Sequence, residues 1–269
     1  MEGGYLMMHV LLLQFAIFHR SAARDLAAKG NPSNFQPIHG HTPFSSAMLH
    51  DPSLKVFFKA ENLKAGEVIP LYFPIKDPLK TPSLLPQEEA DSIPFSSSQL
   101  PYLLDFFGLH PHSVQANSMK QTLKHCEFPP LEGETKFCAT SLESMLEHLR
   151  AIFGQGVDFK VLTTTYIENS SIPLKNYTIL SPKQVEVQKM MGCHTLPYPY
   201  AVFYCHGQKG DTKIYLIKLR DEQGQIIEAV GVCHMDTSHW DPNHIAFQVL
   251  GVKPGEAPIC HVFPSDNMK

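Results

Sequence analysis

The chain has 269 residues, with 22 Lys and Arg against 26 Asp and Glu, so its formal net charge at pH 7 is −4. Its length suits one large domain or two small ones, and an apolar fraction of 43% is enough to build a core. Because there is no basic excess, nucleic acid or an acidic membrane surface is disfavoured as a partner. The sequence has no Gly-rich phosphate loop, which disfavours a nucleotide-dependent enzyme.

The N-terminus is typical of a signal peptide. Leu6–Phe18 is uncharged and, as a helix, too short to span a bilayer. Small residues then offer a cleavage point just before Arg24. We therefore predict a signal peptide at 1–23, a flexible leader or linker at 24–53, a domain at 54–269, and no membrane contact after cleavage.

The remaining chain predicts helices first and strands later. Hydroxyl and carboxylate groups in Thr140–Glu143 fit a capping box that begins an amphipathic helix ending near Gly154. We therefore expect an α+β fold, in which N-terminal helices pack on a C-terminal, antiparallel β-rich, disulfide-stapled domain. The other expected helices are 99–107 and 113–124, and the expected strands are 56–58, 69–73, 158–166, 176–180, 201–205, 213–219, 226–233, 246–252 and 259–263.

Six Cys in a secreted chain indicate three disulfides. Cys126 and Cys138 are a natural local pair, but spacing alone leaves 15 connectivities open. Two sequons, at Asn169 and Asn176, are candidate glycosylation sites and agree with a secretory route. The Cys are Cys126, Cys138, Cys193, Cys205, Cys233 and Cys260.

The strongest pattern in the sequence is that four of the six Cys each precede a His. With 15 His among 269 residues, four such pairs are not a chance pattern. The intervals between successive pairs hold 10, 26 and 25 residues. The paired histidines are His194, His206, His234 and His261.

Strand geometry gives this pattern a chemical meaning. Adjacent side chains on a strand point to opposite faces, so each Cys can face the interior while its His faces the other way. Imidazoles gathered on one surface bind Cu, Zn or Ni, and without thiolate or carboxylate ligands copper is favoured by the affinity order. His239 and His244 are possible additional ligands or supporting donors. The alternative is that the histidines are structural and pack beside the disulfides.

The Cys-His arrangement resembles the signature of the BURP domain, a secreted plant domain with four such pairs near its C-terminus. The flanking sequence is similar too, in Ile69–Pro74, Ala90–Ser96, Lys136–Ser144 and Pro197–Tyr204, and in the Cys233–Trp240 segment. The resemblance runs from about Leu54 to the end of the chain. The short leader without repeats is most similar to the unknown-seed-protein-like group.

The resemblance implies an apoplastic, cell-wall or vacuolar plant protein linked to development, seeds or stress. Some members of the family resemble copper-dependent cyclases that crosslink a Trp or Tyr in a core peptide, which makes the four paired histidines the candidate metal ligands. Residues 24–71 of this chain contain neither Trp nor Tyr, so self-cyclisation of the leader is not expected.

Three hypotheses follow, and they differ in chemistry. The first is a secreted copper-binding protein with a non-catalytic role, which we favour over an enzyme. The second is a copper-dependent cyclase that acts on Tyr or Trp of another peptide. The third is a disulfide-stapled interaction module of the cell wall in which no metal binds. Cell-wall components or peptides are the expected partners, and the catalytic residues stay unassigned.

Overall fold

The computed structural model describes residues 9–12, 51–74, 82–130, 133–165, 173–208 and 210–263. Among these residues, more lie in β-strands than in α-helices, and the strands form two sheets. In spatial order, the five-stranded sheet holds β4 (Glu134–Ala139), β8 (Val202–Gln208), β7 (Lys189–Leu196), β1 (His9–Leu12) and β5 (Phe159–Leu162). The six-stranded sheet holds β2 (Phe57–Lys59), β11 (Ile259–Phe263), β10 (Ile226–His234), β9 (Thr212–Asp221), β6 (Leu174–Val185) and β3 (Val68–Tyr72).

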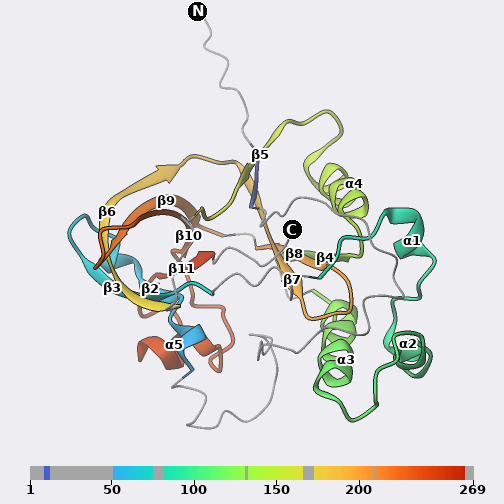
Figure 1. Ribbon diagram of the computed structural model, residues 1–269. Coiled ribbons are helices and arrows are strands. Elements are labelled where there is room, and N and C mark those ends of the chain that lie inside the picture. The colour runs from blue at the N-terminus through green and yellow to red at the C-terminus, as the bar shows by residue number, and fades with distance from the viewer. Residues whose placement is uncertain are drawn as a thin grey trace, which may run out of the picture.

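The six-stranded sheet curls into a nearly closed, barrel-like form (Figure 1). Its two edge strands, β2 and β3, are neighbours in the sequence. They approach each other at one end, where the backbone N–H of Tyr72 donates to the carbonyl oxygen of Lys55 at 2.9 Å. Curling of this kind reduces the exposed strand edge, which is otherwise a site of unwanted pairing.

The helices are few and short. Helices α1 to α4 lie beyond β4 and β8, on the side away from the barrel, whereas α5 lies beside the barrel (Figure 1). The longest of them, α3 and α4, supply Met119, Leu123, Met145 and Leu149 to buried clusters. The helices are α1 (Gln87–Asp91), α2 (Leu100–Phe106), α3 (Val114–Glu127), α4 (Leu142–Phe153) and α5 (Ile245–Leu250).

The predicted α+β class was therefore wrong. The sequence pattern missed β4 and β7, because both strands mix polar and apolar residues without regular alternation. The strand expected at 246–252 is instead helix α5. His244 caps the start of α5, and Gly251 ends it in the left-handed region at φ 64°. An apolar run this short fits either element, and only these end signals favour the helix.

Other local expectations were closer to the structure. Helix α4 begins one residue later than expected, since its capping box joins Ser141 to Ser144 instead of Thr140 to Glu143. Its apolar face still packs on the five-stranded sheet. Within the described residues, no helix is long and apolar enough to cross a membrane.

Most of the predicted signal peptide and leader lies outside the described residues, as does Asn169. Residues 9–12 form β1, which pairs in parallel with β5 and β7. Asn176 lies exposed on β6, where its amide donates to Glu222 at 3.2 Å. The signal peptide and both glycosylation sites stay predictions.

Candidate metal centre

Three disulfides are present, and two of them join residues that face each other on neighbouring antiparallel strands. Cys193 on β7 is bonded to Cys205 on β8, its direct partner in the strand register. Cys233 on β10 is bonded to Cys260 on β11 in the same way. The third disulfide joins Cys126, near the end of α3, to Cys138 on β4.

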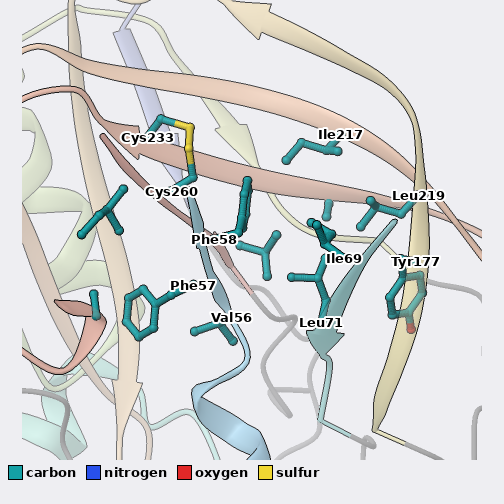
Figure 2. Packing of buried hydrophobic residues seen from close by; sticks show 14 of the residues in the cluster. Val56, Phe57, Phe58, Ile69, Leu71, Tyr177, Ile217, Leu219, Cys233 and Cys260 are labelled. Atoms are coloured by element: carbon teal, nitrogen blue, oxygen red, sulfur yellow. A yellow bond between two sulfur atoms is a disulfide. The ribbon is translucent and has the colours of Figure 1, made fainter. Parts of the chain in front are cut away.

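Each cross-strand disulfide lies in a buried cluster. Cys193 and Cys205 pack in the cluster that α4 covers. Cys233 and Cys260 belong to the barrel cluster, in which Figure 2 shows their bond above Phe58. Because successive residues on a strand alternate in direction, the histidine after each of these cysteines leaves from the opposite face of its sheet.

The first pair of histidines comes from the five-stranded sheet. His194 lies opposite Tyr204, and His206 lies opposite Gly192, so the two imidazoles are diagonal neighbours. Their ring centroids are 5.6 Å apart. The cross-strand geometry that bonds the cysteines on one face thus brings the two rings together on the other.

The second pair repeats this arrangement on the six-stranded sheet. His234 lies opposite Ile259, and His261 lies opposite Val232. Their ring centroids are also 5.6 Å apart, and the two rings are nearly parallel. The two cross-strand Cys-His units therefore have the same local construction, although they belong to different sheets.

Phe263 links the two pairs. Its ring stacks on His194 with centroids 5.0 Å apart and lies 5.1 Å from the ring of His261. A Cβ atom on Gly192 would lie only 3.2 Å from this phenyl ring, so glycine leaves the space that the ring occupies. His206 in turn interacts electrostatically with His234 and His261. All four paired histidines therefore belong to one cluster between the sheets.

The surroundings of His234 and His261 favour neutral imidazole, which is the form that binds metals. Burial, with the nearby His261, lowers the pKa of His234 to about 3. Burial, with the nearby His206, lowers the pKa of His261 to about 4. Two buried rings that resist protonation at neutral pH give this part of the cluster the electrostatic character of a metal-binding site.

The donor set suits a transition metal, but the described side chains do not form a ready-made coordination group. No set of three or more His, Cys, Asp or Glu among the described residues is arranged to hold a metal ion. With metal–nitrogen bonds of about 2 Å, two imidazole centroids on one ion lie about 4–6 Å apart, a range that includes both pairs. Binding would thus require the rings to turn on their side-chain torsions, with the strands in place.

The two additional histidines have different surroundings. His239 is exposed, in the segment before α5. His244 is the N-cap of α5, and its Nδ1 accepts a hydrogen bond from the backbone N–H of Ala246 at 3.2 Å. Its ring lies 4.6 Å from that of Trp240, which also packs against His234 at 4.9 Å. His244 therefore contacts the paired histidines indirectly, through the Trp240 ring that packs against His234.

Sequence reasoning missed three neighbours of the paired histidines: Phe263, Tyr204 and Glu134. Phe263 is two residues after His261 on the same strand, so the period of two could have placed it on the histidine face. Tyr204 stacks on His206 with centroids 4.9 Å apart. Glu134 lies on β4, a strand that the sequence pattern did not predict, and no signal pointed to it.

The family of this chain follows from its similarity to known proteins. The family model described as the BURP domain matches residues 56–269. This chain belongs to the BURP domain family. The matched region contains all four Cys-His pairs and all three disulfides, so the BURP domain of this plant protein is the unit that builds the histidine cluster.

Three relatives show how far the similarity extends. BURP domain-containing protein BNM2A of Brassica napus is 41% identical over 268 residues, covering 97% of this chain and 94% of the relative. BURP domain-containing protein BNM2C of the same species is 45% identical over 231 residues, covering 84% and 82%. BURP domain protein USPL1 of Arabidopsis thaliana is 46% identical over 224 residues, covering 81% and 80%.

Proposed function

We propose that this BURP domain protein is secreted and binds one copper ion through His194, His206, His234 and His261, with a non-catalytic role in development, seeds or stress. The observation that carries the proposal is the pair of equivalent histidine diagonals, one on each sheet, that Phe263 brings into one cluster. All four ligands are imidazoles, because the adjacent cysteines are disulfide-bonded and are not available as thiolates.

Bound copper would supply a Lewis acid and a one-electron redox centre. The residues of the chain hold the ligands in position, because the cross-strand disulfides fix the strand register. Burial lowers the pKa of His234 and His261 and so favours their neutral form. The non-catalytic role is supported by the absence of Trp and Tyr from residues 24–71, which leaves the leader without an oxidisable ring. A secreted location is supported by the three disulfides and the apolar N-terminal segment.

Copper titration tests the proposal, and the sequence offers a built-in reporter. Trp240 is the sole Trp and packs against His234, so bound Cu(II) should quench its fluorescence. Dialysed protein should bind one Cu(II) per chain by calorimetry, with parallel quenching. His194→Ala and His234→Ala should each weaken binding at least tenfold, because each removes one imidazole ligand.

A histidine pair outside the proposed site provides the matched control. His110 and His112 are exposed, and their ring centroids are 5.7 Å apart, close to the spacing of the candidate pairs. The double variant His110→Ala/His112→Ala should bind copper like the parent. Equal affinity of the parent, His194→Ala and His234→Ala would refute the copper proposal and favour the metal-free interaction module.

A further inference from the structure

Glu134 is placed to control the orientation of one paired histidine. Its Oε1 lies 3.4 Å from Nδ1 of His206 and accepts a hydrogen bond from the hydroxyl of Tyr204 at 3.1 Å. The carboxylate is largely buried, with a side-chain exposure of 11%. In the strand register Lys136, two residues along β4, faces His206, and Cys138 faces Tyr204, so all these side chains share one face of the sheet.

Packing around Tyr204 fixes this carboxylate further. The Tyr204 ring stacks on His206 on one side, and the ring of His125 lies 4.3 Å away from it. The ammonium of Lys136 lies 5.6 Å from the centre of the Tyr204 ring and donates to the carbonyl oxygen of His125 at 2.9 Å. The phenol therefore cannot rotate away without breaking several contacts, and its hydroxyl holds the Glu134 oxygen beside His206.

The chemistry of the contact determines which imidazole nitrogen carries the proton. An ionised carboxylate only accepts hydrogen bonds, so the contact with Glu134 favours the neutral tautomer of His206 that carries its hydrogen on Nδ1. The lone pair is then on Nε2. We propose that Glu134 is a positioning residue that fixes His206 in the tautomer whose Nε2 binds the metal, an inference that rests on the proposed copper site. A carboxylate behind a ligating imidazole also increases its basicity.

The tautomer can be measured without any metal. In long-range proton–nitrogen NMR spectra of the metal-free protein, recorded at a pH where the ring is neutral, His206 should show the Nδ1–H pattern. Glu134→Gln should turn this into a mixture of tautomers, because an amide can donate as well as accept. Tyr204→Phe keeps the carboxylate and the aromatic ring but removes the hydroxyl that holds the Glu134 oxygen, so it should shift the pattern part of the way towards the mixture. An Nε2–H pattern in the parent would overturn the inference.

Copper affinity provides the second measurement. Glu134→Gln should weaken Cu(II) binding about 10- to 100-fold, as expected for loss of a carboxylate behind a ligand, and change the nitrogen couplings in the EPR spectrum. Glu134→Asp should recover part of the affinity, and Glu61→Gln, an exposed carboxylate on the barrel side, should bind like the parent.

The two proposals fail in different ways. If the parent and His206→Ala bind copper equally weakly, the copper site and the role of Glu134 are both refuted. If His206→Ala loses affinity while Glu134→Gln keeps that of the parent and its His206 tautomer, copper binding stands and the positioning role is refuted. Should Glu134→Gln fail to fold, the tautomer of the parent and the Glu134→Asp affinity still decide the question.

Discussion

His244 shows how one side chain beside the histidine cluster can also stabilise a helix. From the sequence, we predicted that His244 is a possible metal ligand or a supporting hydrogen-bond donor. In the structure its Nδ1 accepts a hydrogen bond that caps helix α5. Burial lowers the pKa of His244 to about 4, although Asp241 acts in the opposite direction. The ring is therefore neutral at physiological pH, which is the state in which Nδ1 can accept the capping hydrogen bond.

This role predicts both a stability difference and a pH dependence. His244→Ala should unfold more easily than His244→Asn by about 1 kcal/mol, because both lose the ring but Asn keeps a capping acceptor. An unfolded histidine titrates near pH 6.5, so the unfolded chain binds more protons than the folded chain below that pH. The contribution of the neutral ring to the free energy of unfolding should therefore be complete above about pH 6.5 and be lost as the pH falls towards 4.

Urea unfolding of the metal-free proteins at pH 7 and pH 4.5 measures both effects. The parent should lose more stability over this interval than either His244 variant, since the variants lack one of the groups that resist protonation. Equal stability of the Ala and Asn variants at pH 7 would argue against the capping role. An unchanged pH dependence would argue against the lowered pKa.

At the scale of elements, the sequence predicted three of the four Cys-His strands and missed β7, which carries Cys193 and His194. Residues such as Ile226–Cys233 and Ile259–Phe263 combine β-branched residues with clear turn signals, and they form β10 and β11. Strand β4 has no such pattern, because its residues are only partly buried, so Glu134 was not found. Which strands become neighbours depends on tertiary packing, and local sequence periodicity carries no information about it.

Two disulfides of equal loop length allow the effect of a cross-strand disulfide on copper binding to be separated from its effect on stability. Cys126–Cys138 and Cys193–Cys205 span the same sequence separation of 12 residues, so the chain-entropy effect of removing either should be similar, about 3 kcal/mol. Only the second lies directly behind a histidine pair. The double Cys→Ala variant of Cys193 and Cys205 should therefore bind Cu(II) about tenfold more weakly than that of Cys126 and Cys138.

Denaturant unfolding and copper titration of the two double variants together check this expectation. Similar losses of stability with unequal copper affinities would support the cross-strand disulfide as the element that holds His194 and His206 in position. Equal copper affinities would show that backbone pairing alone positions the two rings.

For the molecule as a whole, the arrangement of the two sheets decides whether the histidine pairs act together. Strand alternation predicts that each His lies on the face opposite its Cys, but the pairing of the imidazoles depends on which strands are neighbours. The meeting of the two pairs was not foreseeable either, because it depends on Phe263 packing over Gly192 across the boundary between the sheets. The mostly β, barrel-like architecture is thus what turns two local pairs into one cluster (Figure 1).

Pulsed EPR of the Cu(II)-loaded full chain tests this joining of the sheets most directly, since it detects the imidazole nitrogens bound to the ion. We expect a single copper signal that loses imidazole coupling in His206→Ala, from the five-stranded sheet, and equally in His261→Ala, from the six-stranded sheet. Two independent copper signals, each sensitive to only one of these substitutions, would contradict a shared site, and so would one signal that neither substitution alters.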